Sequence, residues 1–217
     1  MASATKENYL KTIYLLQQKI GKVSLTDISK ALEISPASTN SMIQKLKKLK
    51  LVEQEKYQPV KLTSQGESNA TSIIRKHRLS EMYLTEIMGI GWESVHTIAE
   101  EMEHIDSTIL FDRMDELLNC PKFDPHGSPI PDKEGKFAKT EFKLLSEMNS
   151  GDLVQLVGIE ESSKELLQLL NLKNIKLGTK INILEITAFD KSLTVKINNK
   201  EAVMLSSRVC NSLRVKK

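Results

Sequence analysis

The 217-residue chain contains only two cysteines, Cys120 and Cys210, which lie far apart in the sequence. Small secreted domains depend on several disulfides, so this content excludes a disulfide-rich scaffold and favours a reducing compartment. Aromatic residues are also scarce, at 5%, but apolar residues make up 40% of the chain. We therefore expect an ordinary helix-rich soluble protein in which both cysteines are inert packing residues.

Long apolar runs are absent as well. No stretch approaches the roughly 18 consecutive apolar residues of a transmembrane helix. The first residues, MASATKENYLK, lack the apolar core of a signal peptide. Both absences predict a cytoplasmic protein without a membrane partner.

Acidic residues are few in the N-terminal third, although the net charge of +3 hides this imbalance. Residues 1–76 contain 13 Lys and Arg against 6 Asp and Glu, whereas residues 77–150 contain 7 against 15. A basic region suits a polyanionic partner and an acidic region suits cations, with plain solvated surface as the alternative. The charge distribution thus favours two different partners for two parts of the chain.

A winged helix-turn-helix is predicted for residues 1–72. The apolar spacing of ENYLKTIYLLQQKI predicts a first helix, and SLTDISKALEI predicts a short second helix with Thr26 as its N-cap. Pro36 suits the first turn of a third helix. The inner stripe of that helix would comprise Met42, Ile43, Leu46 and Leu49. The segment LVEQEKYQPVKLT then predicts two short strands about a turn, which supply the wing.

The third helix opens with small polar side chains, which allow close approach to base edges, and continues into lysines suited to phosphates. A helical hairpin with a solvated lysine face is the alternative. The residues predicted to contact double-stranded DNA are Thr26, Ser35, Pro36, Ala37, Ser38, Thr39, Asn40, Ser41, Lys45, Lys47, Lys56 and Lys61.

Residues 73–140 are predicted to be helical and rich in metal-ligand types. An acidic helix over 93–105 would carry one face with four such side chains at about 100° per residue. They are His96, Glu100, Glu103 and His104. On the preceding helix, over 64–88, His77 and Glu81 are four residues apart and therefore neighbours. Nearby carboxylates resist ionising together, and a cation would relieve that repulsion, whereas a solvated charged face would need none.

The segment CPKFDPHGSPIPDKEGK, over residues 120–136, holds four prolines and two glycines and predicts a loop. Within it, Asp124 and His126 flank Pro125 and could fold back over a metal site, or the segment could be a plain linker. Residues 150–217 contain short β-rich runs and a helix near 163–172, which predict a small β-barrel. The expected fold is therefore mainly α with a β-rich C-terminal domain.

Several motifs spread along the whole chain carry a family resemblance. They are YLKTIYLL, DISKALEISPASTNSMIQKLKKLKLV, LTSQG, RKHRLSEMYL, VHTIAEEMEH, CPKFDPHGSPIP and LGTKINILEI. Together they resemble the diphtheria toxin repressor family of iron- and manganese-dependent repressors. The resemblance implies a homodimeric winged-helix repressor with a helical metal-binding and dimerisation domain and an SH3-like C-terminal domain. It also implies that Mn(II) or Fe(II) enables binding to inverted-repeat operators, without any enzymatic activity.

The same resemblance implies two metal clusters. The first would comprise Asn8, Glu100, Glu103 and His104, with His77 close by. The second would comprise His77, Glu81, His96, Asp124, His126 and an acidic residue of the C-terminal domain, taken as Glu161 among Glu160, Glu161 and Glu165. We call these two sets the first cluster and the second cluster.

Three residues depart from what this family generally has. Asn8 stands where manganese-type members have an aspartate, and its neutral amide oxygen is a weaker ligand for a hard cation. Glu100 stands where iron-type members have a cysteine, which favours Mn(II) or Fe(II) over softer metals. Lys11 stands where some manganese members place a second carboxylate, so a closely bridged pair of metal ions is not expected.

The sequence thus predicts a metal switch that joins the first helix to the dimerisation helices and fixes the spacing of the DNA-reading helices. A metal-independent winged-helix regulator is one alternative. A di-metal carboxylate enzyme is another, because ESVH at 93–96 and EMEH at 101–104 both fit the Glu-x-x-His motif. In such enzymes the two copies face one another from different helices, whereas here one helix would carry both.

Overall fold

The computed structural model describes residues 3–55, 58–198 and 200–217. The chain forms two compact units. The first comprises Met1–His77, Ala99–Asp112 and Pro131–Phe137, and the second comprises Arg78–Ile98, Arg113–Ile130 and Ala138–Lys217. Three helices, named below as α4, α5 and α6, each begin in one unit and end in the other. Lys56, predicted to contact DNA, lies outside the described residues.

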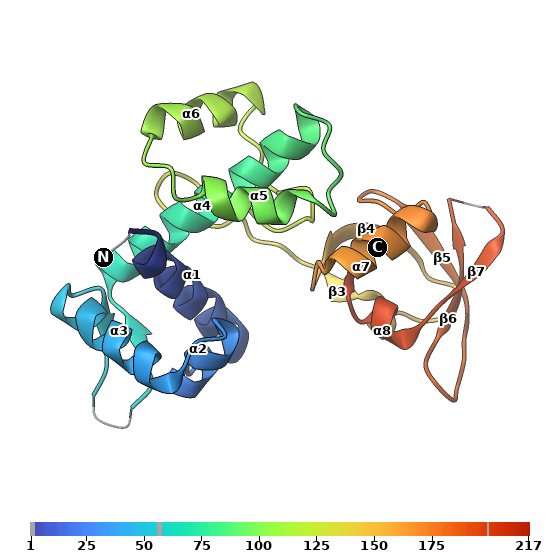
Figure 1. Ribbon diagram of the computed structural model, residues 1–217. Coiled ribbons are helices and arrows are strands. Elements are labelled where there is room, and N and C mark those ends of the chain that lie inside the picture. Colours follow the sequence, from blue (N-terminus) through green and yellow to red (C-terminus); the bar gives the residue numbers. More distant parts are fainter. Residues whose placement is uncertain (1–2, 56–57, 199) are drawn as a thin grey trace. The chain divides into compact units, whose positions relative to one another are not determined.

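The first unit opens with the predicted DNA-reading elements (Figure 1). They are α1 (Ser3–Ile20), α2 (Leu25–Ala31), α3 (Pro36–Lys48), β1 (Val52–Glu53) and β2 (Lys61–Leu62). The two strands pair antiparallel, with Val52 opposite Leu62. The predicted order of helix, helix-turn-helix and wing is therefore confirmed.

A single apolar core holds these elements together. Its largest buried side chains are Tyr9, Leu10 and Ile13 of α1, Ile28 of α2, and Ile43 and Leu46 of α3. Leu49, predicted in the same stripe, is instead 54% exposed. The prediction was wrong there because α3 ends at Lys48, so Leu49 no longer follows the helical spacing.

The N-cap of α2 is Ser24. The sequence analysis predicted Thr26, and that prediction was wrong. Ser24 Oγ accepts from the Asp27 amide at 3.2 Å, and Asp27 Oδ2 accepts from the Ser24 amide at 2.9 Å. This reciprocal capping box satisfies two amides that the helix itself leaves without partners. The hydrogen bonds from Ser24 hold the pKa of Asp27 below its ordinary value. The acidic residue three positions after Ser24 was the signal that identifies the cap.

Three further helices follow, α4 (Ser64–Glu86), α5 (Val95–Met102) and α6 (Thr108–Leu117). The acidic helix α5 is shorter than predicted, so Glu103 and His104 lie in the turn that follows it. Ser107 Oγ accepts from the Leu110 amide at 3.3 Å and thereby caps the start of α6. Within the described part of the chain, no helix is long and apolar enough to cross a membrane.

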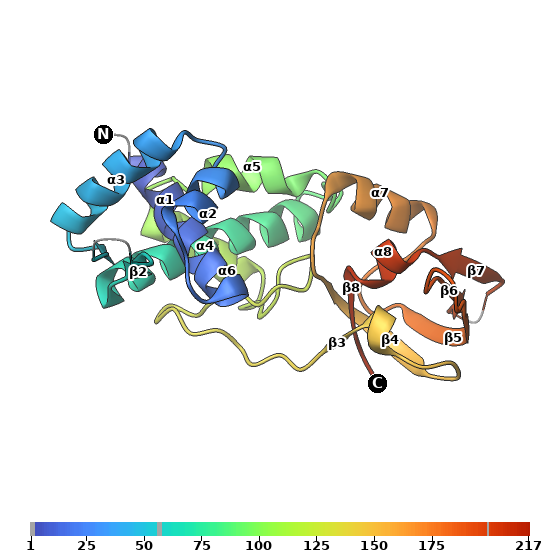
Figure 2. The ribbon, with the colours of Figure 1, turned by 90° about the horizontal axis from the view of Figure 1, so that it is seen from below.

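The second unit contains a six-stranded antiparallel sheet of order β3-β8-β4-β5-β6-β7. The strands are β3 (Lys143–Leu144), β4 (Leu153–Ile159), β5 (Lys180–Ile186), β6 (Leu193–Ile197), β7 (Ala202–Leu205) and β8 (Leu213–Lys216). Two helices, α7 (Lys164–Leu172) and α8 (Ser207–Cys210), bury apolar side chains in the same core as the strands, and Figure 2 shows both helices with the sheet. The short 3₁₀ helix η1 (Leu145–Glu147) follows β3. The expected β-rich C-terminal domain is confirmed.

The two cysteines differ in their surroundings. Cys210 is buried, and burial raises the pKa of its thiol to about 11, which makes it inert. Cys120 is exposed just after α6, so the prediction that it packs inside was wrong. Neither forms a disulfide.

The capping box of α2 gives a first prediction. Ser24→Ala should lower the free energy of unfolding by about 1 kcal/mol, because the Asp27 amide loses its acceptor. Thr26→Ala is the matched control and should change stability by no more than about 0.5 kcal/mol, since Thr26 is exposed and does not cap the helix. Urea unfolding followed by circular dichroism measures both. Equal effects of the two substitutions would contradict the assignment.

Candidate metal centres and DNA-reading surface

The N-terminal turn of α3 forms an exposed polar surface. Ser35 Oγ accepts from the Ser38 amide at 3.2 Å and caps the helix, with Pro36 in its first turn. The side chains of Asn40, Ser41 and Lys45 are exposed on the same helix. This surface can approach the edges of DNA bases without steric hindrance from large side chains.

Two residues of the predicted DNA-contact set have other roles. Thr39 is fully buried, because positions 39, 42, 43 and 46 share the core face of α3, so it cannot contact DNA. Lys47 donates to the Gln54 carbonyl at 2.6 Å and thereby joins α3 to the wing. Other members of the set that are exposed are Thr26, Ala37 and Lys61.

The first cluster is centred on Glu103, whose side chain is fully buried in the first unit. Lys11 Nζ, from α1, lies 2.6 Å from Glu103 Oε1 and 2.9 Å from Oε2. His77 Nδ1, from α4, lies 2.6 Å from Oε2. Both carboxylate oxygens therefore already have close polar partners, from two different helices.

These partners keep Glu103 ionised despite its burial. Burial is the largest influence and raises the pKa of the carboxyl, but the hydrogen bond with His77 and the Lys11 ammonium together outweigh it. The pKa of Glu103 therefore lies below its ordinary value. A buried carboxylate is thus compensated by groups of the chain itself.

The remaining members of the first cluster do not converge on one point. His104 Nδ1 lies 2.6 Å from Glu7 Oε2, and its Nε2 is 3.7 Å from Glu103 Oε1. The Glu100 side chain is 52% exposed and 4.0 Å from Lys11 Nζ. Among the residues that the structure describes, Asn8 Oδ1 is a buried atom without a hydrogen-bond partner. Sequence analysis did not include Glu7, although its position four residues before Lys11 places it on the same face of α1.

The core of the second cluster lies in the second unit and brings together Glu81, Asp124 and His126. One ligand atom of each lies within 4.8 Å of the others, and all three residues are buried. Burial, reinforced by the negative charge of Glu81, raises the pKa of Asp124 above its ordinary value. Arg78 Nε, 3.6 Å from Asp124 Oδ2, compensates part of this charge. Two acidic groups and one imidazole thus converge on a site that favours a divalent cation.

His126 is held in one orientation by a backbone group. Its Nε2 lies 2.9 Å from the Trp92 carbonyl oxygen, which can only accept, so Nε2 carries the proton of the neutral ring. Its Nδ1 then faces Glu81 Oε2 at 3.5 Å. The indole of Trp92 stacks on the imidazole with 6.0 Å between the ring centres. This arrangement directs the nitrogen lone pair towards the carboxylates, as a metal ligand requires.

The loop that carries Asp124 and His126 is seated on strand β4. The Ile159 amide donates to the His126 carbonyl at 2.8 Å. Gly127 has a φ of +82°, and a Cβ there would lie 2.2 Å from the Val157 carbonyl oxygen. Only glycine fits this close approach of two backbones. The sheet of the second unit therefore positions two ligands of the second cluster.

The other predicted members of the second cluster differ in their exposure and in their contacts. His96 Nδ1 lies 3.1 Å from Glu81 Oε1, and its side chain is 58% exposed. His77 lies one turn before Glu81 on α4 and contacts Glu103 in the first unit. Glu161 is exposed after β4. Of its neighbours, Glu160 pairs with Arg214 at 2.5 Å, and Glu165 accepts hydrogen bonds at the start of α7.

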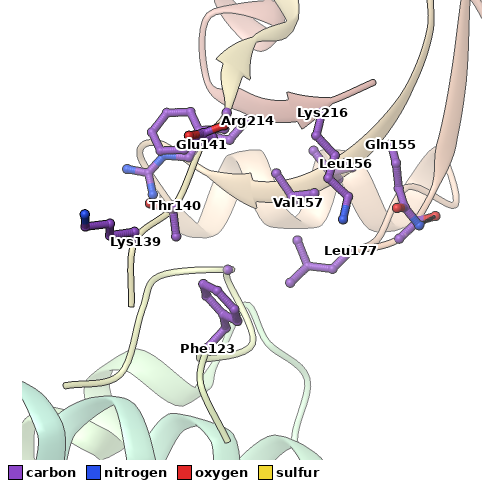
Figure 3. Close-up of a pocket in the computed structure, with 13 residues that line it drawn as sticks. Phe123, Lys139, Thr140, Glu141, Gln155, Leu156, Val157, Leu177, Arg214 and Lys216 are labelled. Carbon is purple, nitrogen blue, oxygen red and sulfur yellow. Dashed lines mark hydrogen bonds between the residues drawn. The ribbon is translucent and has the colours of Figure 1, made fainter. Parts of the chain in front are cut away.

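A separate cavity of about 430 Å³ lies between the loop that carries Asp124 and His126 and the sheet (Figure 3). Figure 3 shows Phe123 of the loop on one side and Val157 and Leu177 on the other. Its charged lining residues are Lys139, Glu141, Arg214 and Lys216. With three cations and one carboxylate, and without histidine or cysteine, this cavity does not suit a metal ion.

Comparison with known proteins gives matches along nearly the whole chain. Residues 1–60 match the family described as "Iron dependent repressor, N-terminal DNA binding domain". Residues 63–132 match "Iron dependent repressor, metal binding and dimerisation domain", and residues 143–217 match the "FeoA domain".

Individual relatives agree with these family matches. The iron-dependent repressor IdeR of Mycobacterium leprae is 31% identical over 160 residues, which cover 70% of each chain. The solved structure of a manganese-dependent transcriptional repressor in complex with manganese gives a TM-score of 0.85 at 29% identity, over 97% of this chain and 98% of that chain. The structure of the manganese regulator SloR gives 0.74 at 30% identity, over 98% of each chain.

The seat of the ligand loop gives a second prediction. Gly127→Ala should lower both thermal stability and Mn²⁺ affinity, because the added methyl group meets the Val157 carbonyl and displaces Asp124 and His126. Gly151→Ala is the matched control, since Gly151 has a similar φ of +87° but open space around it. Its cost should be only the backbone strain of about 1–2 kcal/mol, without any loss of Mn²⁺ affinity. Melting curves and isothermal titration calorimetry test this, and equal Mn²⁺ affinities for the two variants would refute it.

Proposed function

Because this chain belongs to the family of iron- and manganese-dependent transcriptional repressors, we propose that it is a cytoplasmic homodimer that represses metal-homeostasis genes by binding inverted-repeat operator DNA when loaded with Mn(II) or Fe(II). The observation that carries this proposal is the buried convergence of Glu81, Asp124 and His126 in a chain that also presents the exposed α3 surface. The first suits a divalent cation and the second suits DNA.

We assign the regulatory ion to the second cluster. Glu81, Asp124, His126 and His96 would hold it through carboxylate oxygens and imidazole nitrogens, which Mn(II) and Fe(II) accept. His77 and Glu161 remain the predicted further ligands. When bound, the ion would add positive charge beside the two buried carboxylates.

The chain's own residues prepare this site. Backbone amides of His126 and Ser128 each donate to Asp124 Oδ1 at 2.9 Å, which fixes the carboxylate and leaves Oδ2 towards Arg78. The Trp92 carbonyl fixes the ring of His126. The Asp124 carboxylate and the His126 ring are thus held in place before any ion binds, which reduces the conformational entropy lost on binding.

DNA reading is assigned to α3 and the wing. Ser38, Asn40 and Ser41 would approach base edges, while Lys45 and Lys61 would contact phosphates. Because the operator is an inverted repeat, two copies of α3 have to be held at a fixed spacing by the dimer. We propose that residues 1–72 form the DNA-reading domain, 73–140 the metal-binding and dimerisation domain, and 150–217 the SH3-like domain.

The protein is not an enzyme of the di-metal carboxylate class. Helix α5 begins at Val95, so Glu93 of the first Glu-x-x-His motif lies before the helix. Glu93 accepts from Asn171 Nδ2 at 3.0 Å instead of facing a second motif. The paired geometry that such enzymes need is therefore not formed by these residues.

Metal-dependent operator binding gives a third prediction. In a mobility-shift assay with an inverted-repeat operator, Mn²⁺ or Fe²⁺ should tighten binding by about 5- to 150-fold over chelator-treated protein, the usual range of allosteric coupling. The double substitution Glu81→Gln, Asp124→Asn should abolish the effect of metal while leaving the weak metal-free binding unchanged. Equal operator affinity with Mn²⁺, Fe²⁺ and chelator would favour the metal-independent regulator.

Competition between protons and metal gives a fourth prediction. Burial is the largest influence on the pKa of His126 and lowers it. The hydrogen bond and charge of Glu81, the charge of Asp124 and the Trp92 carbonyl together outweigh burial, so the pKa lies above its ordinary value. The ring is therefore more protonated near neutral pH, and a metal has to displace that proton. Mn²⁺ affinity should rise with pH, by about tenfold or more between pH 5.5 and 7.5, with proton release. Calorimetry in two buffers of different ionisation enthalpy measures both, and a pH-independent affinity would contradict this reasoning.

A further inference from the structure

The contact between Lys11 and Glu103 resembles an ion site that is already filled by a group of the chain. The Lys11 ammonium lies between both carboxylate oxygens at 2.6 and 2.9 Å. Its side chain is 14% exposed and that of Glu103 is fully buried. A divalent ion that bound both oxygens of Glu103 would need the same position, and two cations cannot share it without strong repulsion.

The neighbouring side chains do not provide an alternative position for an ion. Glu103 Oε2 is also held by His77, and His104 is drawn towards Glu7. Among the described residues, the groups of three that could hold a metal include none of Glu100, Glu103 and His104. Asn8 contributes a neutral amide oxygen. The first cluster therefore does not fit a metal ion as it stands.

We propose that the Lys11 ammonium is a built-in cation of the first cluster, which attaches α1 to Glu103 without metal, so that each protomer binds one divalent ion instead of two. The part about the remaining ion rests on the function proposed above, whereas the role of Lys11 does not. In this arrangement the Lys11–Glu103 contact holds α1, and with it the DNA-reading helices, to Glu103 at any metal concentration. Regulation by metal is then a property of the second cluster alone.

The first experiment counts ions. Protein saturated with Mn²⁺ and then desalted should retain one ion per protomer by elemental analysis, and Glu81→Gln, Asp124→Asn should retain none. Two ions in the unchanged protein, with one kept by this variant, would overturn the role of Lys11 and leave metal-dependent repression intact. Asn8→Asp with Lys11→Glu should restore the missing acidic ligands and raise the count to two. A count that stays at one in this variant would also overturn the proposal.

The second experiment uses metal-free protein and does not depend on the second cluster. Lys11→Met leaves Glu103 buried without its cation and should lower the melting temperature by roughly 5–10 °C. Lys19→Met, the same change at an exposed end of α1, should shift it by less than about 2 °C. The double variant Lys11→Met, Glu103→Gln should recover most of the loss, because it removes the charge that needs compensation.

Two results of the second experiment would overturn the proposal. One is a Lys11→Met variant as stable as the unchanged protein. The other is a loss that Glu103→Gln does not restore, since this would mark Lys11 as a packing residue. Added Mn²⁺ should raise the melting temperature of Lys11→Met more than that of Lys19→Met, because an ion can enter the first cluster only where the ammonium has been removed, while both variants keep the second cluster. A protein that binds no Mn²⁺ at all would refute the proposed function, while the metal-free melting temperatures would still decide the role of Lys11.

Discussion

The charge of three buried carboxylates is the constraint on which the middle of this chain depends. Glu81, Glu103 and Asp124 are each at most 4% exposed, and an isolated charge in such a position is strongly unfavourable. A carboxyl group in such a position either takes up a proton, which the raised pKa of Asp124 favours, or needs a positive partner that is held in place by the fold. In the first unit that partner is the Lys11 ammonium, whereas in the second unit Arg78 Nε lies 3.6 Å from Asp124 Oδ2 and His126 Nδ1 lies 3.5 Å from Glu81 Oε2. The second unit differs from the first in that two buried carboxylates converge there, and a divalent cation would relieve their mutual repulsion.

Helix α4 carries a residue of each centre. His77 contacts Glu103, and Glu81 lies one turn further along the same helix. The ligand loop adds Asp124 and His126, which are fixed by backbone groups and not by other flexible side chains. Rigid elements hold the polar groups at the required distances, so little reorganisation accompanies ion binding.

The sequence was sufficient to predict the helices and strands, but insufficient to predict which side chains and backbone groups contact one another. Helical periodicity and the Pro36 start located α3, because local spacing determines which residues face the core. The cap of α2 and the exposure of Leu49 were missed because a helix end shifts by one or two residues without a strong local signal. From the sequence, the Asp-Pro-His loop could supply two metal ligands or be a plain linker. Its seat on β4 depends on Gly127 meeting a strand 30 residues away, which no local pattern shows.

The position of Lys11 shows why a ligand list transferred by resemblance is incomplete without geometry. From the sequence, this lysine only weakened the case for two bridged ions, because its side chain could equally extend into solvent. The structure places its ammonium on Glu103, which the family resemblance implied as a metal ligand. A cation that cannot dissociate stabilises one arrangement at all metal concentrations, whereas an ion that exchanges with solution can shift populations, since only a ligand with different affinity for two states does so. Under the proposed function, the second cluster, where Glu81 and Asp124 converge, is therefore the part of this molecule that would respond to the metal concentration.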